Sequence, residues 1–393
     1  VQGALDQLWT DQAAVTFTAI QYIRIFAGTY DENVTPNAGF DPDKQNGYLL
    51  VIEGDPDDDR ANIIVQPTGG VRALDVNCDH VLARHMTLDA TAGASNQAVF
   101  AGAGALNMDV VDCEVIGRSG AQAIYTTQGV SIDECLVTAA GDGLRGAPLT
   151  LKQTTVQRSG AQGGTGLLSS GTGGMSIDFS DVAGFSVGVQ PSAFVALRLT
   201  NVTIYNCATG ALIDRMGIQS PSIINCIFKD NTTDLQLSCW PDEAGGELGG
   251  ETVLRNNCLH GETNFAYDGS VTKTHAEFVA FDRVNEDGDL VDTDPLLTDP
   301  GSGDFSLQDA SPCRGTGHGS GAVSYVDGTA ANASHPNIGS SGAAADPPAP
   351  SWAGGVSNIT TTGLPGRGSV LVTFDAASIG GAGLSVEYGV EHR

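Results

Sequence analysis

Short alternations of apolar and polar residues recur along the chain from about Val81 to Leu259. Clear copies lie at 108–115, 130–137 and 223–228, and each consists of two apolar alternations joined by a small polar step. The last apolar residue of each copy recurs at intervals of 27, 22, 19, 26, 22, 24 and 31 residues. These anchors are Leu88, Val115, Val137, Val156, Val182, Ile204, Phe228 and Leu259. A strand-like pattern repeated about every 20 to 30 residues is typical of a β-solenoid.

Alignment of the copies on these anchors separates inward from outward positions. The column five residues before the anchor is apolar throughout and holds Ala83, Val110, Ile132, Leu151, Ile177, Leu199, Ile223 and Leu254. The column two residues before it holds Met86, Cys113, Cys135, Thr154, Ser180, Val202, Cys226 and Asn257. Between them, a mostly polar column holds His85, Asp112, Glu134, Gln153, Phe179, Asn201, Asn225 and Asn256. We therefore expect two strands per copy that meet at a tight bend, where Asn tolerates left-handed backbone angles and stacks on Asn.

Each copy is followed by a Gly-rich turn and a further short apolar segment, as at 121–125, 143–145 and 210–213. Three strands per turn, closed by the stacking of turns, give an all-β chain with the cross-section of a right-handed parallel β-helix. We expect about eight rungs over 71–259, preceded by one or two irregular rungs with strands near 22–30, 48–54 and 63–66.

The segments outside the repeat predict the domain organisation. Residues 1–20 have helical spacing and are expected to cap the first rung, which would otherwise expose a sheet edge. The stretch 341–352 is a linker by composition, and strand-like alternations follow it at 368–374 and 384–388. The predicted segments are 1–20 (N-terminal cap), 21–260 (parallel β-helix), 261–340 (C-terminal rungs and cap), 341–352 (linker) and 353–393 (start of a second β domain). Either this second domain is truncated here or its strands pair elsewhere.

The net charge disfavours a nucleic-acid partner, and the length of the apolar runs excludes a membrane-spanning helix. The net charge is −28, with 46 acidic against 18 basic residues, so the basic footprint of a nucleic-acid-binding protein is absent. No apolar run reaches the length of about 18 residues that a membrane-spanning helix needs. The acidity suits solubility or cation binding.

The chain holds eight cysteines but is too large to depend on a disulfide framework. Cys113, Cys135 and Cys226 fall in one inward column, where free thiols behave as small apolar residues. Bridges between Cys239 and Cys258, or between Cys313 and a partner, fit the sequence better than bridges within that column. No spacing of cysteine and histidine supports a zinc site.

Several stretches resemble right-handed parallel β-helix proteins of the pectate-lyase-like class. They are 27–34 (AGTYDENV), 52–56 (IEGDP), 294–296 (DPL), 303–307 (GDFSL) and 310–313 (ASPC). The resemblance covers about residues 1–340, and the tail from 353 resembles the start of a fibronectin-type-III-like sandwich. The class implies an extracellular location or display on a cell or virion surface. It does not imply one chemistry, because lyases, hydrolases, phage tailspikes and adhesins share this scaffold.

Catalysis on such a scaffold needs a base beside carboxylates on the outer face of neighbouring rungs. The candidates are Arg145 and the pair Asp214 and Arg215, but about three rungs separate them, or roughly 14 Å. Paired carboxylates of a glycoside hydrolase could come from Asp112, Asp133, Glu134, Asp178 and Asp181, which lie at or near the bend. We expect most of these charges to be structural or solvated.

Two acidic clusters are candidate calcium sites, because Ca²⁺ takes six to eight oxygen ligands. They are Asp55, Asp57, Asp58 and Asp59, and the later group Glu286, Asp287, Asp289, Asp292 and Asp294. Neither cluster has the spacing of the helix-loop-helix calcium site.

The sequence favours a structural or adhesive module of a larger extracellular appendage or virion fibre, with glycans or neighbouring subunits as partners and self-association expected. The alternative is a polysaccharide lyase or glycoside hydrolase that acts on the outer face of the solenoid. No catalytic motif is assembled in the sequence, which favours the non-enzymatic function.

Overall fold

The computed structural model describes most of the chain up to residue 340 and two short strands beyond it. The described residues are 1–7, 21–36, 50–69, 72–92, 97–103, 105, 107–120, 122–171, 173–192, 196–213, 221–237, 252–267, 271–280, 284–318, 337–340, 360–363 and 370–373. The chain divides into two compact units, Val1–Ala345 and Asp346–Arg393.

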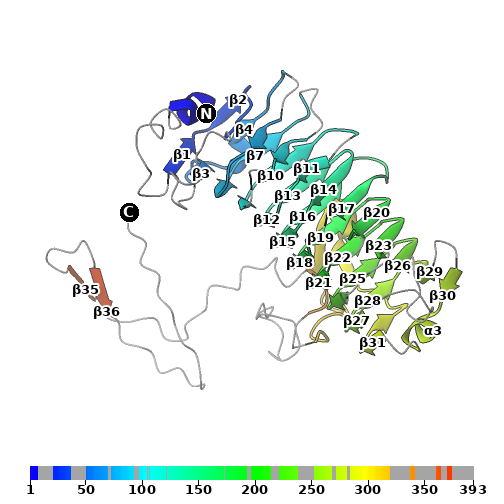
Figure 1. Cartoon of the computed structure of the whole chain (residues 1–393). Helices are drawn as coiled ribbons and strands as arrows, with labels where there is room; N and C mark the ends of the chain where they lie inside the picture. The colour runs from blue at the N-terminus through cyan, green and yellow to red at the C-terminus, as the bar shows by residue number, and fades with distance from the viewer. Residues whose placement is uncertain are drawn as a thin grey trace. The chain divides into compact units, whose positions relative to one another are not determined.

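The first unit is a parallel β-helix, as the sequence predicts, and its stacked rungs are visible along its length in Figure 1. Most rungs give one strand to each of three long sheets. Sheet 1 contains β1 (Gln21–Ile25), β3 (Leu50–Gly54), β6 (Val81–Arg84), β9 (Met108–Val111), β12 (Val130–Asp133), β15 (Leu149–Lys152), β18 (Met175–Asp178), β21 (Leu197–Thr200), β24 (Ser222–Ile224), β27 (Thr252–Arg255) and β31 (Val284–Asp287).

Sheets 2 and 3 complete the cross-section. Sheet 2 contains β2 (Gly28–Tyr30), β4 (Ile63–Val65), β7 (Thr87–Asp89), β10 (Glu114–Gly117), β13 (Leu136–Ala139), β16 (Thr155–Arg158), β19 (Asp181–Ala183), β22 (Thr203–Tyr205), β25 (Ile227–Lys229), β28 (Cys258–His260) and β32 (Leu290–Val291). Sheet 3 contains β5 (Leu74–Val76), β8 (Val99–Ala101), β11 (Gln122–Thr126), β14 (Asp142–Gly146), β17 (Thr165–Ser169), β20 (Val187–Gln190), β23 (Thr209–Ile213), β26 (Thr233–Leu237), β29 (Thr263–Tyr267) and the antiparallel β30 (Val271–Lys273).

The bend between sheets 1 and 2 confirms the columns read from the sequence. All eight residues of the polar column have φ between 46° and 57°, which is the left-handed region. The columns on either side of the bend, two residues before and five before the anchor, are at most 4 % exposed, as are the anchors themselves. The side chain of Asn225 also donates to Asn201 Oδ1 at 3.5 Å, so neighbouring asparagines do stack. This arrangement fixes which side chains of each rung point outward.

The inward thiols are buried as predicted. Cys113, Cys135 and Cys226 are at most 4 % exposed, and the seven cysteines within the described residues are free. Cys239, one member of a predicted bridge, lies outside the described residues. Cys313 is buried against Cys258, but the bridge predicted at Cys313 is not formed, and the Cys258 thiol donates to the Thr293 carbonyl at 3.1 Å.

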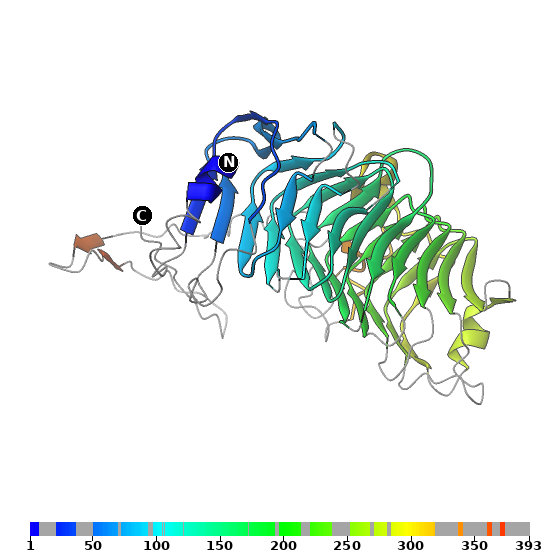
Figure 2. The ribbon, with the colours of Figure 1, turned by 45° about the horizontal axis from the view of Figure 1, so that its top comes forward.

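The end of the first unit folds back over the outer face of sheet 2. We call residues 292–318 and 337–340 the strap. Leu297, Phe305 and Ile338 of the strap form a buried cluster with Ile227 and Cys258 of sheet 2. In Figures 1 and 2 the yellow-to-orange segment lies against the green rungs. The strap contains β33 (Leu297–Asp299), η2 (Pro300–Ser302) and β34 (Asp304–Leu307), and β33 pairs with β34.

Short helices stand at the two ends of the solenoid. Residues 2–7 are helical, and Leu5 of this helix is buried in the core, whereas 8–20 of the predicted cap lie outside the described residues. At the other end, α3 (His275–Val279) begins with a capping box formed by Thr274 and Glu277. Phe278 of α3 stacks on Phe265 with ring centroids 4.2 Å apart, so the helix covers the end of sheet 3.

The second unit has one described hairpin, β35 (Thr360–Gly363) with β36 (Val370–Thr373). The strand β36 lies within the predicted segment 368–374, whereas 384–388 lies outside the described residues. In the part of the chain that the structure describes, no helix is long and apolar enough to cross a membrane.

Candidate functional site

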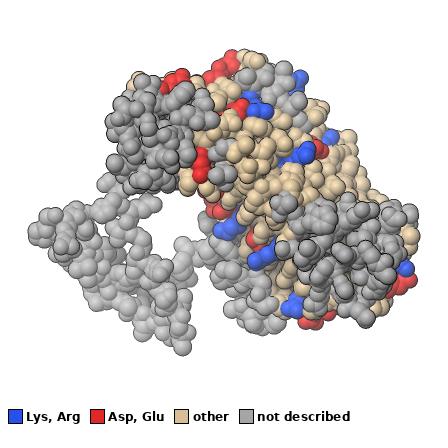
Figure 3. All heavy atoms as spheres, in the orientation of Figure 1, with Lys and Arg blue, Asp and Glu red and all other residues tan. Residues whose placement is uncertain are grey.

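The outer face of sheet 1 carries a row of mostly charged register partners, interrupted by uncharged residues on three rungs, in which charged neighbours always have opposite signs. In register, this row is Arg24, Glu53, Arg84, Val111, Asp133, Lys152, Asp178, Thr200, Ile224, Arg255 and Asp287. Rungs repeat at about 4.8 Å, so opposite charges on neighbouring rungs come within reach of each other. Figure 3 shows acidic and basic side chains in small mixed groups between stretches of uncharged surface.

Glu53 has the strongest ion pairs in this row. Its two carboxylate oxygens accept hydrogen bonds from Arg24 at 2.9 Å and Arg84 at 2.5 Å, and its side chain is only 4 % exposed. Burial raises the pKa of Glu53, but the hydrogen bonds and charges of Arg84 and Arg24 outweigh it and lower the pKa overall. A carboxyl group held ionised in this way cannot serve as a general acid near neutral pH.

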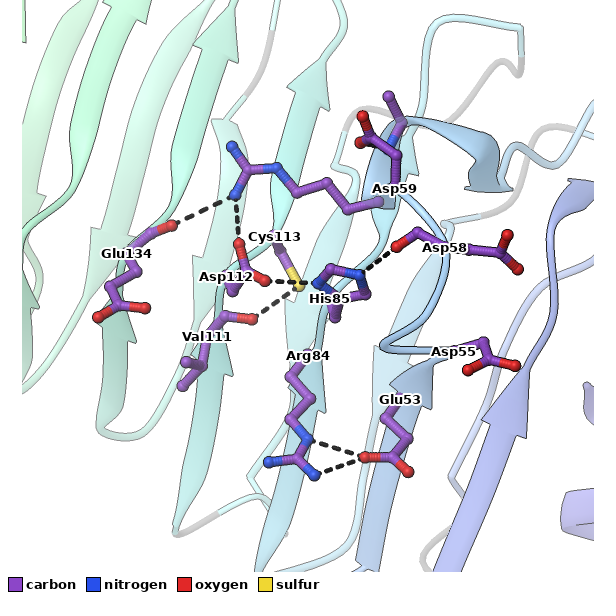
Figure 4. A network of polar contacts seen from close by, with 12 residues as sticks. Glu53, Asp55, Asp58, Asp59, Arg84, His85, Val111, Asp112, Cys113 and Glu134 are labelled. Atoms are coloured by element: carbon purple, nitrogen blue, oxygen red, sulfur yellow. Dashed lines mark hydrogen bonds and ion pairs between the residues drawn. The ribbon is translucent and has the colours of Figure 1, made fainter.

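A second polar network lies beside it, where the loop before β4 meets the bend column (Figure 4). His85 Nδ1 lies 2.6 Å from Asp112 Oδ2, and His85 Nε2 lies 2.7 Å from the Asp58 carbonyl. Arg60 donates to Asp112 Oδ1 at 2.7 Å. The network therefore ties a loop of an early rung to bend residues of the next rungs.

The network holds the loop against the bend, and its histidine is not placed to act as a base. Both neighbours of the His85 ring are acceptors, so both ring nitrogens carry hydrogen when these contacts are made. The hydrogen bond to Asp112, and then the one to Asp58, raise the pKa of His85. A protonated imidazole with both nitrogens engaged has no lone pair with which to accept a substrate proton.

Three of the four acidic residues of the first predicted calcium cluster accept hydrogen bonds from backbone amides. Asp55 accepts from the Asp57 amide at 3.2 Å, and Asp58 accepts from the Ala27 amide at 3.3 Å. Asp59 caps the 3-10 helix η1 (Arg60–Asn62). These bonds account for three of the carboxylates without a metal ion, and calcium binding by this loop stays a prediction.

Lys229 lies close to two carboxylates and a histidine. Its Nζ lies 2.9 Å from Asp230 Oδ1, 3.3 Å from Asp294 Oδ1 and 3.3 Å from His260 Nδ1. Burial lowers the pKa of Lys229, but the bonds and charges of Asp230 and Asp294 exceed it and raise the pKa. A catalytic lysine base needs the opposite shift, so Lys229 in this cluster is held in its charged form and is not poised as a base.

The acidic residues of the second predicted calcium cluster are divided among different partners. Asp292 accepts from Asn264, Asp294 pairs with Lys229, and Asp287 is exposed at the end of β31. Asp289 is turned away from these residues and has a fully buried side chain. Calcium binding by these carboxylates is therefore a prediction that the described contacts leave open.

Of the remaining acidic candidates near the bend, Glu134 is exposed, whereas Asp133, Asp178 and Asp181 are engaged. Asp133 lies 3.9 Å from Lys152, and Asp178 lies 3.9 Å from Arg198. Asp181 accepts hydrogen bonds from Thr155 and from Ser340 of the strap. Covered or paired carboxylates of this kind do not form the open pair that a glycoside hydrolase needs.

The outer face of sheet 3 has a different character, with two aromatic rings between two arginines. We call Arg72, Phe100, Tyr125 and Arg145 the aromatic–arginine row. Phe100, Tyr125 and Arg145 are register partners on three successive rungs. The rings of Phe100 and Tyr125 lie 5.6 Å apart, and the guanidinium carbons of Arg72 and Arg145 lie 3.5 Å and 5.5 Å from the nearer ring centroid.

The two arginines of the row differ in their partners. Arg72 forms an ion pair with Asp75 at 2.8 Å. Arg145 forms no ion pair within the described residues, and its Nε is buried without a hydrogen-bond partner. Arg145 is therefore a cation beside an aromatic ring with no described counter-ion, and a ligand would reach the terminal guanidinium nitrogens and not the buried Nε.

The structure brings together only part of the predicted catalytic set. Arg145 joins the aromatic–arginine row, while Asp214 and Arg215 lie outside the described residues. The sequence reasoning missed Phe100 and Tyr125 as its neighbours. An alignment of the third strands of successive rungs would have placed Tyr125 and Arg145 in one outward column, because 122–126 and 142–146 share the same burial pattern.

Neither a comparison of the sequence with protein-family models nor one with curated proteins gives a match.

Proposed function

We propose that the chain is a glycan-binding β-helix module, displayed outside the cell or on a virion as part of a larger appendage or fibre. The observation that carries this proposal is the aromatic–arginine row on sheet 3. Aromatic faces stack on the apolar faces of sugar rings, and rigid rings lose little conformational entropy on binding. A ligand that extends along the stack of rungs can contact several members of the row at once.

The same row favours acidic glycans over neutral ones. Arg145 offers a planar fork of donors that matches a carboxylate, and no described carboxylate occupies it. The net charge of the chain is −28, so its acidic surface repels polyanions in general. A cationic site such as the one at Arg145 is therefore a distinct place at which an acidic glycan can bind.

The architecture supports the proposed setting. We assign the β-helix to the pectate-lyase-like class on the stretches 27–34, 52–56 and 303–307, and the tail from 353 to the start of a fibronectin-type-III-like domain. The hairpin of β35 and β36 is compatible with such a start. A long solenoid joined to a second β unit suits a fibre component, with neighbouring subunits as further partners.

Binding to a polysaccharide panel tests the proposal. Polygalacturonate, alginate, dextran and a β-glucan are titrated into the full chain by calorimetry, with Tyr125→Ala and Arg145→Gln as variants. Loss of one stacked ring is expected to weaken binding about tenfold, or about 1.4 kcal/mol. Gln190→Ala is the matched control, because Gln190 lies in the same outward row two rungs beyond Arg145.

The outcomes separate the alternatives. Binding of acidic polymers that falls in Tyr125→Ala and Arg145→Gln and persists in Gln190→Ala supports the proposal. Absence of binding to every polymer, or equal affinity in all variants, refutes it. Release of new reducing or unsaturated ends by the wild-type chain would favour the alternative, a polysaccharide lyase or glycoside hydrolase.

A further inference from the structure

Three side chains of metal-ligating types converge at the C-terminal end of the solenoid, where the short yellow-green helix α3 lies in Figure 2. They are His275 of α3, Glu286 of β31 and Asp289 in the turn before β32. One donor atom from each lies within 4.8 Å of the other two, and no other such group of three occurs among the described residues.

The spacing of the donors does not match hydrogen bonding. His275 Nε2 lies 3.7 Å from Asp289 Oδ2 and 3.9 Å from Glu286 Oε1. Hydrogen bonds between such atoms need about 2.7 to 3.2 Å. Both His275 Nε2 and Asp289 Oδ2 are buried atoms without a hydrogen-bond partner. Such atoms are costly unless something else satisfies them, so each one calls for a specific explanation.

The same spacing fits a bound cation. Metal bonds to imidazole nitrogen and carboxylate oxygen are about 2.0 to 2.2 Å, which places neighbouring ligands of a tetrahedral ion about 3.4 Å apart. The separations of 3.7 Å and 3.9 Å need to close by only a few tenths of an ångström. The side chain of Asp289 is fully buried, with its free oxygen directed at His275.

Neighbouring groups hold the donors in place. Asp289 Oδ1 accepts from the amide and the side chain of Asn257, at 2.8 Å and 3.0 Å, which leaves Oδ2 free for a ligand. Glu286 Oε1 accepts from the Asp289 amide at 3.0 Å. The His275 ring lies 5.8 Å from the ring of Phe265. Supporting contacts of this kind orient the ligands of protein metal sites.

We propose that His275, Glu286 and Asp289 bind a divalent transition-metal ion of the zinc class, which fastens α3 to the last rung of the solenoid. The mixed nitrogen and oxygen donors favour such an ion over calcium, which takes six to eight oxygens. Three protein ligands leave the remaining coordination position to water. Because the ligands come from α3, β31 and the following turn, binding stabilises the C-terminal end of the fold.

Metal titration of the full chain tests this site. The chain is stripped with EDTA, exchanged into metal-free buffer and titrated with zinc chloride, with calcium chloride in parallel. We expect one zinc ion per chain by calorimetry and elemental analysis, and a rise in the melting temperature. His275→Gln and Asp289→Asn should each weaken zinc binding at least about tenfold.

The control is Asp287→Asn, which removes a carboxylate from the exposed end of β31. The Asp287→Asn variant should bind zinc as tightly as the wild type does. The melting temperature of each variant in EDTA distinguishes a folding defect from the loss of a metal ligand. If Asp289→Asn fails to fold, zinc binding by His275→Gln alone tests the site. No zinc binding by the wild type refutes the site and leaves a histidine held between two carboxylates. Undiminished zinc binding in His275→Gln, or calcium bound in preference to zinc, also overturns the proposal.

Discussion

The three asparagines of the bend column each have two roles. Asn225 adopts φ of 55°, and its side chain binds both the amide and the carbonyl of His318 in the strap. Asn201 donates to the carbonyls of Asn337 and Gly339, and Asn256 donates to the carbonyl of Thr316. The residue type that permits the bend is therefore also the one that attaches the strap.

Substitution of Asn225 separates these roles. Asn225→Ala loses the side-chain bonds and places an alanine in the left-handed region, and we expect the free energy of unfolding to fall by about 2 to 3 kcal/mol. Asn225→Gly loses the same bonds but tolerates the backbone angle, so it should be more stable than Asn225→Ala by about 1 kcal/mol. Urea denaturation followed by circular dichroism measures both. Equal stability of the two variants would show that the bend stores no strain at this position.

The strap is the element that only tertiary contacts define. It covers the outward side of sheet 2, and Ser340 at its end donates to Asp181 and bonds Thr203 Oγ1 at 2.9 Å. Burial raises the pKa of Asp181 to about 7, against the opposing hydrogen bonds of Ser340, Thr155 and Thr203. The folded state consequently binds a proton at Asp181 that the unfolded chain releases near its ordinary pKa of about 3.9.

The sign of the pH effect follows from this proton. Between about pH 4 and pH 7 the folded state holds more protons at Asp181 than the unfolded state, so stability contributed by this group falls as pH rises. Asp181→Asn is neutral at every pH and can keep both hydroxyl contacts. At pH 8 we expect it to be more stable than the wild type by about 2 kcal/mol, a value discounted for the partial exposure of Asp181.

Thermal melts of both proteins at pH 4.5 and pH 8 measure this difference. The gain should be present at pH 8 and largely absent at pH 4.5. Asp178→Asn, a change of the same kind on the exposed face of sheet 1, serves as the control. A gain that is the same at both pH values would contradict an origin in the Asp181 carboxyl group.

At the scale of the whole molecule, two electrostatic effects oppose each other. The ion pairs on sheet 1 attract across rungs, while the net charge of −28 repels throughout the folded chain. Exposed ion pairs contribute little individually, at about 0 to 1 kcal/mol, so repulsion is expected to dominate.

Salt dependence measures which effect is larger. An increase of sodium chloride from about 0.01 M to about 1 M shortens the Debye length from roughly 30 Å to 3 Å. We expect the melting temperature to rise by several degrees, because screening relieves the net repulsion more than it weakens the paired charges. Sucrose, which is uncharged, is the control for general solute effects. A fall in melting temperature with salt would show that the sheet 1 row outweighs the net charge.

Much of the fold was readable from the sequence because the repeat imposes one environment per column. The inward thiols and the strands of each rung follow from period-2 alternation, and the left-handed bends at Asn201, Asn225 and Asn256 follow from the tolerance of Asn for positive φ. The candidate sites were harder to predict from the sequence, because a site on a solenoid is assembled from residues about 20 to 30 positions apart. Arg145 was identified without its aromatic neighbours, and Asp289 without His275.

The sequence by itself determined the repeat, its register and the direction of each side chain within a rung, since these depend on local spacing and backbone preference. Only the tertiary structure decided what covers the outer faces and which residues meet at the ends of the solenoid. It placed the strap on sheet 2 and His275 beside Glu286 and Asp289. The strap and α3 lie outside the repeat, so the periodicity of the sequence does not specify where they pack.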